Sequence, residues 1–424
     1  MADLTSNTGG IVSPNPFWLA SAPPTNSGPQ IMRAFDAGWG GAVWKTLGAP
    51  IQNISSRFGA IEWRNGAGVG FNNIELITDR PLESNFKEMY EVKKRYPKHA
   101  VIASLMVETR EEWREIIKRS EDAGADGLEL NFGCPHGMCE RGMGSAVGQE
   151  PSVNSRITSW VKEFATVPVL VKLTPNVADI RPHGIAAQDG GADGVALINT
   201  IKSIIGVDID NFVPYPSVGG KSTNGGYCGA AVRPIALHMC ASLAREPAFN
   251  LPISGIGGIT NWRDALEFIL LGASSVQVCT EVMLRGYRIV EDMIEGLNTY
   301  MDERNFKTLA DIQGRAIPAY SNWGDLDLNH EIIAKIDSSQ CIGCQVCVVA
   351  CHDGAHQCIH PDPNTEVRVP VVDEDECVGC NLCQIVCPVP GCITMEKVDN
   401  GFAPASWNQH IGQGAPLRHK KGSH

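Results

Sequence analysis

Apolar and polar positions alternate in two ways over the first 300 residues of the chain. Short runs rich in β-branched residues are separated by longer stretches with helical periodicity, which is typical of βα units on a parallel sheet. The pattern predicts strands at 17–21, 41–45, 101–105, 127–131, 168–172, 194–199, 252–256 and 275–279. Eight βα units in this length favour a closed (β/α)8 TIM barrel over an open doubly wound sheet.

The segment 108–123 shows the helical period clearly. Four of its residues fall on one face: Trp113, Ile116, Ile117 and Ser120. Gly-Ala-Asp-Gly precedes two strands, at 124–127 and 191–194, and Leu-Gly-Ala-Ser at 271–274 precedes a third. These repeated helix–glycine–strand junctions predict a left-handed glycine at each helix end.

Two cysteine runs with the spacing C-x2-C-x2-C-x3-C follow the barrel segment. This spacing is typical of bacterial two-cluster ferredoxins, in which the fourth cysteine of each run binds the other [4Fe–4S] cluster. One predicted ligand set is therefore Cys341, Cys344, Cys347 and Cys387, and the other is Cys377, Cys380, Cys383 and Cys351. Structural zinc or a disulfide framework are the alternatives, but two complete four-cysteine copies favour clusters. The spare Cys358 and Cys392 are assigned to packing.

The chain therefore divides into a barrel and a small ferredoxin-like domain. We predict an FMN-binding barrel over 1–300, a connector over 301–335, a two-cluster domain over 336–398 and a C-terminal tail over 399–424. The tail is polar and basic, which indicates a mobile or packing segment rather than a site.

Composition narrows the function classes. The net charge of -12 and the isoelectric point near 5.4 argue against nucleic-acid binding. No apolar run approaches the ~20 residues of a membrane span. Fifteen cysteines without a recognisable secretion signal suit a reducing compartment, so a cytoplasmic protein is expected.

Polar residues or glycines follow most of the predicted strands, where barrel active sites lie. Lys45 and Lys172 suit an electron-rich cofactor, because an ammonium group stabilises negative charge on a reduced ring. Gly257, Gly258, Cys279 and Thr280 follow the last two strands, where barrels commonly bind phosphate. Each feature has a structural alternative, such as a solvated lysine or a tight turn. Together with the clusters they predict FMN, which converts two-electron chemistry into single-electron steps.

The loop after the fourth strand carries the candidate acid. Four glycines and a proline in 131–144 predict a loop, and such loops close over barrel sites. Cys134 is a candidate proton donor, because a thiol pKa near ~8.5 can be tuned towards the working pH. Its alternative is a small buried apolar residue. Cys139 competes for the role, and His136 either orients substrate or caps the loop.

Several segments closely resemble dihydropyrimidine dehydrogenases, in particular the pyrimidine-reducing subunit of the bacterial two-subunit, NAD-dependent enzymes. They are NPFWLASAP (15–23), NNIELI (72–77), ELNFGCPHGMCERGMG (129–144), KLTPN (172–176) and GGYCGAAVRPIAL (225–237). The barrel half also resembles dihydroorotate dehydrogenases. The resemblance implies interconversion of uracil or thymine with the 5,6-dihydro base.

The resemblance also assigns roles. Cys134 matches the acid that protonates pyrimidine C5 while flavin N5 gives hydride to C6. The substrate-binding positions are Asn73, Glu75, Asn131, Gly133, Asn199 and Thr200. Gly133 stands where the mammalian enzyme has serine, so one substrate hydrogen bond is expected to be missing. The FMN contacts are Ser21, Lys45, Thr46, Lys172, Gly229, Gly257, Gly258, Cys279 and Thr280.

Electron supply requires a partner. The family's complete enzyme has a half that binds FAD and NAD(H), whereas no G-x-G-x-x-G stands here between a predicted strand and helix. The resemblance therefore implies a separate flavoprotein subunit that oxidises NADH, in a hetero-oligomer built on a dimer of this chain. The competing hypotheses are a dihydroorotate-type oxidase of another cyclic amide and a pure electron-transfer protein.

Overall fold

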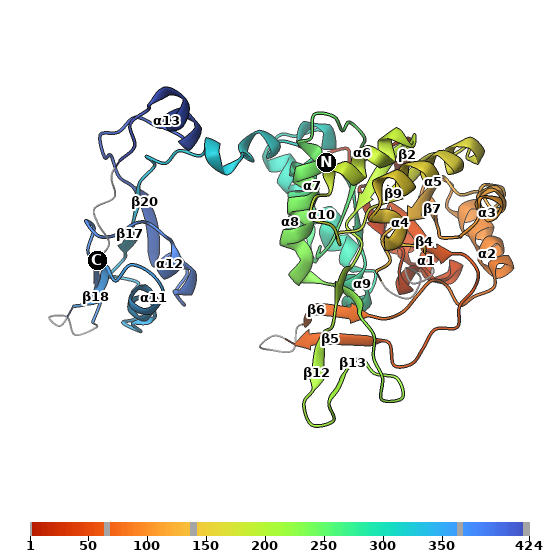
Figure 1. Ribbon diagram of the computed structural model, residues 1–424, viewed down its shortest axis with the longest axis horizontal. Coiled ribbons are helices and arrows are strands. Elements are labelled where there is room, and N and C mark those ends of the chain that lie inside the picture. Colours follow the sequence, from red (N-terminus) through yellow and green to blue (C-terminus); the bar gives the residue numbers. More distant parts are fainter. Residues whose placement is uncertain (1, 63–67, 136–141, 363–367, 419–424) are drawn as a thin grey trace. The chain divides into compact units, whose positions relative to one another are not determined.

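The computed structural model describes residues 2–62, 68–135, 142–362 and 368–418. The chain forms two compact units, Met1–Ala319 and Tyr320–His424, called here the barrel unit and the cluster unit (Figure 1). The segment 301–335, predicted as a connector, is divided between them. Helix α10 (Ile289–Glu303) extends into it from one side, and strand β17 (Ile332–Ile336) begins within it.

Eight parallel strands close into a barrel in the order β10-β15-β16-β3-β4-β7-β8-β9. The (β/α)8 prediction is confirmed, and each predicted strand overlaps an observed one. The strands are β3 (Phe17–Leu19), β4 (Gly41–Leu47), β7 (Ala100–Leu105), β8 (Gly127–Asn131), β9 (Val169–Lys172), β10 (Gly194–Leu197), β15 (Ile253–Ile256) and β16 (Ala273–Val278).

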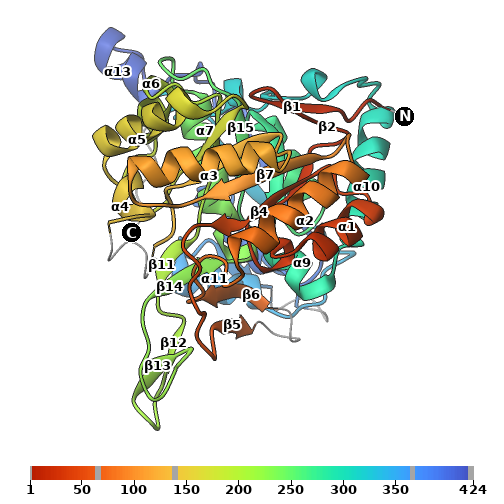
Figure 2. The same ribbon diagram turned by 90° about the vertical axis from the view of Figure 1, so that its right-hand side faces the viewer.

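Helices surround the barrel, and Figure 2 shows α2, α3 and α5 across its outside. Helix α3 buries the four residues predicted from its period, and its N-cap is Thr109, whose hydroxyl accepts a hydrogen bond from the Glu112 amide. The predicted junction glycines are left-handed, with φ of +86° at Gly124, +88° at Gly191 and +103° at Gly272. The helices of this unit are α1 (Gly28–Ala37), α2 (Leu82–Arg95), α3 (Arg110–Asp122), α4 (Ser145–Gly148), α5 (Pro151–Phe164), α6 (Arg181–Asp189), α7 (Arg233–Ala244), α8 (Trp262–Leu270), α9 (Thr280–Arg285) and α10.

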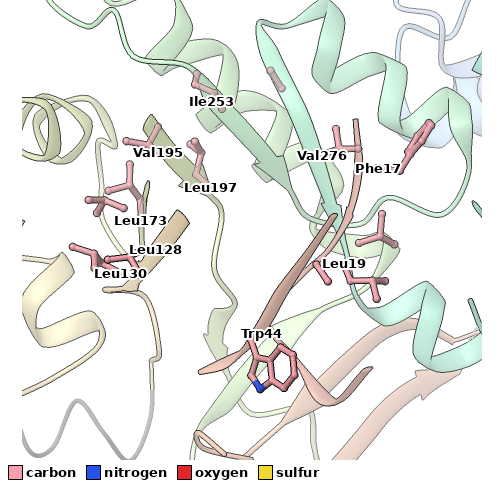
Figure 3. Close-up of a cluster of buried hydrophobic side chains, with 14 of the residues drawn as sticks. Phe17, Leu19, Trp44, Leu128, Leu130, Leu173, Val195, Leu197, Ile253 and Val276 are labelled. Atoms are coloured by element: carbon pink, nitrogen blue, oxygen red, sulfur yellow. The ribbon is translucent and has the colours of Figure 1, made fainter. Parts of the chain in front are cut away.

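The main core lies between the strands and these helices. Strand side chains such as Phe17, Trp44 and Leu128 (Figure 3) belong to one buried cluster with Ile31 of α1 and Trp113 of α3. Fully burying one large apolar side chain contributes roughly 1.5–3 kcal/mol. The core therefore holds the strand ends, and the side chains on them, in fixed positions.

An N-terminal hairpin covers the opposite end of the barrel from the site. It consists of β1 (Ser6–Thr8) and β2 (Ile11–Ser13), joined at Gly9 and Gly10, both of which have positive φ. Ile11 packs with Trp18 and Val43 in a small buried cluster. Thr8 Oγ1 also donates to Ser275 Oγ at 2.9 Å, which ties the hairpin to the start of β16.

A four-stranded antiparallel sheet that the sequence pattern did not predict stands at the barrel mouth. Its order is β11-β14-β6-β5, and its strands are β11 (Ile201–Ser203), β14 (Gly225–Cys228), β6 (Gly68–Asn73) and β5 (Phe58–Glu62). These strands are short and rich in glycine, so they lack the β-branched runs that signal a strand. A further hairpin joins β12 (Gly206–Asp208) to β13 (Val213–Tyr215).

The cluster unit repeats one motif. Strands β17 and β20 (Ile393–Lys397) pair antiparallel, as do β18 (Ile359–Pro361) and β19 (Pro370–Val372). Helices α11 (Val346–Gly354) and α12 (Leu382–Val386) begin at the end of the two CxxCxxC segments and include Cys347 and Cys383. Left-handed residues recur at equivalent positions, Gly343 with Gly379 and Gln345 with Asn381. The internal repeat in sequence is therefore also a repeat in conformation.

The tail packs onto the cluster unit as far as the structure describes it. Helix α13 (Trp407–Gln413) lies within it. Asn329 Nδ2 donates to the carbonyls of Ala403 (2.7 Å) and Pro416 (3.0 Å), and Arg418 pairs with Glu331 at 2.6 Å. Among the described residues, no helix has the length and apolarity needed to cross a membrane.

Candidate active site

A deep cleft opens at the carboxyl ends of the barrel strands, beneath the mouth sheet. It encloses about 1680 Å³ of space free of atoms, part of it open to solvent. Every barrel residue predicted for the site except Gly133 lines it. These residues are Ser21, Lys45, Thr46, Asn73, Glu75, Asn131, Cys134, Lys172, Asn199, Thr200, Gly229, Gly257, Gly258, Cys279 and Thr280.

The side-chain amides of Asn131 and Asn199 form a connected network on one wall of the cleft, called here the amide wall. Asn199 Nδ2 donates to Asn131 Oδ1 at 3.0 Å, and Asn131 Nδ2 donates to Thr46 Oγ1 at 3.0 Å. The Asn199 Oδ1 accepts from the Thr200 amide at 2.8 Å. Each amide carries two donors and an acceptor oxygen with two lone pairs. Asn199 therefore keeps one N–H and one lone pair for a ligand, whereas Asn131 keeps one N–H, because its oxygen also accepts from the Gly133 amide.

A buried ion pair lies on the same cleft. Lys45 Nζ is 3.1 Å from Glu75 Oε1, and the two side chains are 6% and 7% exposed. Arg57 Nε approaches the same carboxylate oxygen at 3.7 Å. Removing one member of such a pair leaves an unpaired buried charge, at a cost of about 3–5 kcal/mol. Lys45 and Glu75 are therefore structurally dependent on each other.

A second lysine–glutamate pair holds Lys172, and the sequence analysis missed its partners. Lys172 Nζ is 3.5 Å from Glu129 Oε1, and Gln277 Nε2 donates to Glu129 Oε2 at 2.8 Å. Glu129 is fully buried. Glu129 Oε1 and Gln277 Oε1 have no hydrogen-bond partner among the described residues. The available signal was a carboxylate and an amide inside buried parallel strands, which are normally apolar.

Cys134 lines the cleft from the loop after β8. It is 9% exposed and packs in an apolar cluster with Ile77, Met106 and Met143. Its carbonyl accepts a hydrogen bond from the Ser145 amide at 3.0 Å, which ties the loop to α4. His136 and Cys139, the other loop candidates, lie outside the described residues.

Gly133 stands behind the amide wall rather than in the cleft. Its amide donates to Asn131 Oδ1 at 3.3 Å, and a Cβ atom at this position would overlap the side chain of Asn199. The residue therefore permits the close approach of Asn199. A side chain at this position would have to displace Asn199.

Gly133→Ser is expected to displace Asn199 and break its hydrogen bond to Asn131. An unsatisfied buried polar group costs about 1–3 kcal/mol, which corresponds to a rise in KM of roughly 5- to 100-fold. Steady-state kinetics with uracil, the substrate that the sequence resemblance implies, measure this change. Gly412→Ser is the control, because nothing lies within 4 Å of a Cβ atom at that position. An unchanged KM in Gly133→Ser would contradict the steric role.

The two cavities of the cluster unit each gather one predicted ligand set. One cavity of about 330 Å³ is lined by Cys341, Cys344, Cys347 and Cys387. The other, of about 300 Å³, is lined by Cys351, Cys377, Cys380 and Cys383. In each cavity the fourth cysteine comes from the opposite run. Four thiols around one cavity are the donor set that a [4Fe–4S] cluster requires.

Comparison with known proteins places this architecture in a family. Residues 4–301 match the dihydroorotate dehydrogenase family, and residues 334–395 match the 4Fe-4S dicluster domain. The NAD-dependent dihydropyrimidine dehydrogenase subunit PreA of Escherichia coli K12 is 42% identical over 398 residues, which cover 93% of this chain and 96% of PreA. This chain belongs to the dihydropyrimidine dehydrogenase family. It is an oxidoreductase with a 4Fe-4S domain.

Two other relatives match a smaller share of this chain. The chloroplastic dihydropyrimidine dehydrogenase (NADP(+)) of Arabidopsis thaliana is 42% identical over 337 residues, covering 76% of this chain and 79% of that protein. The catalytic subunit of dihydroorotate dehydrogenase B (NAD(+)) of Pyrococcus horikoshii is 36% identical over 308 residues, covering 73% and 96% respectively. The barrel is thus common to both enzyme types, whereas the PreA match extends over both units.

The cleft of this chain fits a flavin, as expected for a member of a flavin-binding family. Lys45 and Lys172 supply cations, and the unpaired Gln277 Oε1 can accept a hydrogen bond from a bound ring. Gly229 and Gly258 lie at positive φ with their backbones packed together, so the chain presents backbone rather than side chains there. Desolvation raises the pKa of Cys228 to about 11 and that of Cys279 to about 12, so both cleft thiols are neutral.

Gly258→Ala is expected to lower flavin retention by about tenfold or more. A Cβ atom at Gly258 would lie 2.8 Å from the Arg233 amide nitrogen and 2.9 Å from the Gly229 carbonyl oxygen. Such a contact, together with a left-handed φ of +71°, costs on the order of 1–3 kcal/mol. Flavin absorbance per chain after gel filtration measures retention. Gly314→Ala is the control for backbone strain alone, because Gly314 has φ +74° and nothing within 4 Å.

Proposed function

We propose that this chain is the pyrimidine-reducing subunit of an NAD(H)-linked dihydropyrimidine dehydrogenase. It interconverts uracil or thymine with the 5,6-dihydro base. The observation that carries the proposal is the amide wall of Asn131 and Asn199, which lies on the same cleft as Cys134. A uracil ring alternates carbonyl acceptors with N–H donors, and asparagine amides match both.

The substrate positions lie on three sides of the cleft. Asn131 ends barrel strand β8 and Asn199 follows β10, whereas Asn73 ends a strand of the mouth sheet and Glu75 follows it. Asn73 Oδ1 accepts from the Glu75 amide at 3.2 Å, which orients the amide group. Thr200 adds a hydroxyl beside Asn199. This set binds the base through its polar edge and leaves the C5–C6 edge for chemistry.

Cys134 exchanges the proton at C5. FMN, when bound, supplies the hydride equivalent that pyrimidine C6 accepts from flavin N5. The chain provides the remaining parts of the reaction: it orients the base, holds the Cys134 Sγ–H beside the cleft and excludes water with the mouth sheet. In the reverse direction Cys134 accepts the proton from C5.

The FMN contacts are divided between two kinds of residue. Ser21, Thr46 and the two lysines surround the end of the cleft near the amide wall, and the lysine charges favour the reduced, electron-rich ring. The phosphate group is held by glycine backbones and by Cys279 and Thr280 after β16. Glu129 keeps Lys172 in place.

Electrons reach FMN through two [4Fe–4S] clusters bound by the two cysteine sets. They come from a separate FAD- and NAD(H)-binding flavoprotein subunit, in a hetero-oligomer built on a dimer of this chain. The support is the match over both units to PreA, whose name describes a subunit of an NAD-dependent enzyme. Thiolate-bound clusters suit the reducing cytoplasm, where we place the enzyme.

The experiment that tests the proposal assays the isolated chain. With uracil and NADH alone, no turnover is expected, whereas chemically reduced enzyme should convert uracil to dihydrouracil. Absorbance spectra with iron and flavin quantification should give eight irons and one FMN per chain. Robust NADH-dependent turnover without a partner would contradict the proposed electron route. Zinc in place of iron would overturn the cluster assignment.

A dihydroorotate oxidase is the second candidate, favoured by the barrel match and by the Pyrococcus horikoshii relative. The same preparation distinguishes them. Turnover of dihydroorotate without turnover of dihydrouracil would favour the second candidate. We expect the opposite, because Glu75 on the cleft wall opposes an additional substrate carboxylate.

A further inference from the structure

Each of the two cavities of the cluster unit is lined by its own five cysteines among the described residues. A [4Fe–4S] cluster binds only four. The additional cysteines are Cys392 in the cavity of the first set and Cys358 in the cavity of the second. They are 2% and 4% exposed. In the sequence, each comes after the cysteine that the opposite run contributes to its cavity: Cys392 after Cys387, and Cys358 after Cys351. The assignment of these two residues to packing leaves this placement unexplained.

The two additional thiols have different hydrogen-bond partners. Cys358 Sγ lies 3.6 Å from Cys351 Sγ, within the range of a sulfur hydrogen bond. The Cys358 amide also donates to Cys351 Sγ, at 3.3 Å. Cys392 also lies close to ligand sulfurs of its cavity, but its thiol donates to the Asp337 carbonyl at 3.7 Å. A thiol has a single proton, and the Asp337 carbonyl takes that of Cys392, whereas the Cys358 thiol contacts the ligand sulfurs of Cys351 and Cys377.

Cluster binding fixes the direction of the hydrogen bond between Cys358 and Cys351. A cysteine that binds a cluster is a thiolate and can only accept a hydrogen bond. Cys358, which is not in the ligand set, must then be the donor. Hydrogen bonds to cluster sulfurs withdraw electron density and stabilise the reduced state, which is one of the means by which proteins set cluster potentials.

We propose that Cys358 is a thiol hydrogen-bond donor to the cluster ligand Cys351 and raises the reduction potential of the second cluster. The inference rests on the proposed function for the presence of both clusters. Cys358 is a positioning residue that acts through the ligand sulfur. It takes no part in electron transfer as a redox group and binds no iron. Its backbone hydrogen bond to Cys351 is independent of the side chain and persists when the side chain is truncated.

The test is an EPR-monitored redox titration of the full-length chain with its iron and flavin, prepared anaerobically. Cys358→Ala is expected to keep eight irons per chain and to lower the midpoint potential of one cluster only. Cys351→Ser, which alters the ligand itself, assigns that signal to the second cluster. Cys358→Ser retains a hydroxyl donor and is expected to keep the midpoint close to that of the native chain. Cys392→Ala is the matched control, because it removes a buried thiol from the other cavity.

Three outcomes would overturn the proposal. The first is two intact clusters with unchanged potentials in Cys358→Ala. The second is a fall of the second-cluster potential in Cys392→Ala as well, which would show a general loosening of the unit. The third is loss of iron in Cys358→Ala with retention in Cys351→Ala, which would make Cys358 the ligand. Fewer than two clusters in the native chain would instead refute the cluster assignment of the proposed function.

Discussion

Cys134→Ala is expected to abolish pyrimidine reduction while leaving FMN and iron bound. General acid catalysis by a positioned side chain contributes about 10²–10⁴-fold, and this loss should appear in kcat. The flavin should remain, because the lysines and glycines proposed to hold it come from other strands. Rapid mixing of chemically reduced enzyme with uracil, followed by flavin reoxidation, measures the step directly.

The control for Cys134→Ala is Cys240→Ala. Cys240 is a fully buried thiol on α7 that does not line the cleft, so its removal tests the effect of lost volume alone. Full turnover in Cys134→Ala would exclude the thiol as the acid. A chain that only carries electrons would transfer them at the native rate in both variants, which distinguishes the electron-carrier hypothesis.

Cys347→Ala is expected to uncouple NADH oxidation from pyrimidine reduction. Cys347 is a buried member of the first predicted ligand set, and a cluster that loses one of its four thiolates loses stability. NADH-dependent turnover with the partner subunit should fall below about 1% of the native rate, because the electrons from NADH are proposed to pass through the clusters. Reduction of uracil by chemically reduced flavin should persist.

The matched control for Cys347→Ala is Cys392→Ala, because both thiols are buried in the same cavity and only one belongs to the predicted ligand set. Iron content per chain is measured alongside activity. Equal iron loss in both variants would mean that packing, rather than ligation, holds the unit together. Native NADH-dependent turnover in Cys347→Ala would remove the first cluster from the electron route.

The two buried lysine–glutamate pairs have a common consequence for the cleft. Each lysine that faces the proposed flavin has its own carboxylate partner, Glu75 for Lys45 and Glu129 for Lys172. Two unpaired ammonium groups would be costly to bury before a ligand arrives. The carboxylates therefore allow a cationic site to exist in the folded protein. Glu75 faces the cleft, whereas Glu129 is fully buried below it.

Local patterns account for the features that were predicted correctly. Buried parallel strands are short apolar runs, and the glycine after a helix takes up a left-handed conformation that other residues resist. Gly124, Gly191 and Gly272 could therefore be predicted from neighbouring residues alone. Cluster spacing is equally local, because three of four ligands lie within seven residues of each other. The fourth ligand follows from a general rule of such domains.

The rest depended on contacts between residues distant in the sequence. Glu129 and Gln277 are 148 positions apart, and closure of the barrel brings them together beneath Lys172. The mouth sheet pairs strands from separate loops whose glycine-rich sequences carry little strand signal. Gly133 was expected to affect a substrate hydrogen bond, and the contact that a side chain there would make with Asn199 was not predicted. Sequence alone thus determined the barrel, the cluster module and the residues of the cleft, because those signals are local. Tertiary structure decided which side chains hold those residues in place, because partners for buried charges and close contacts exist only once distant strands meet.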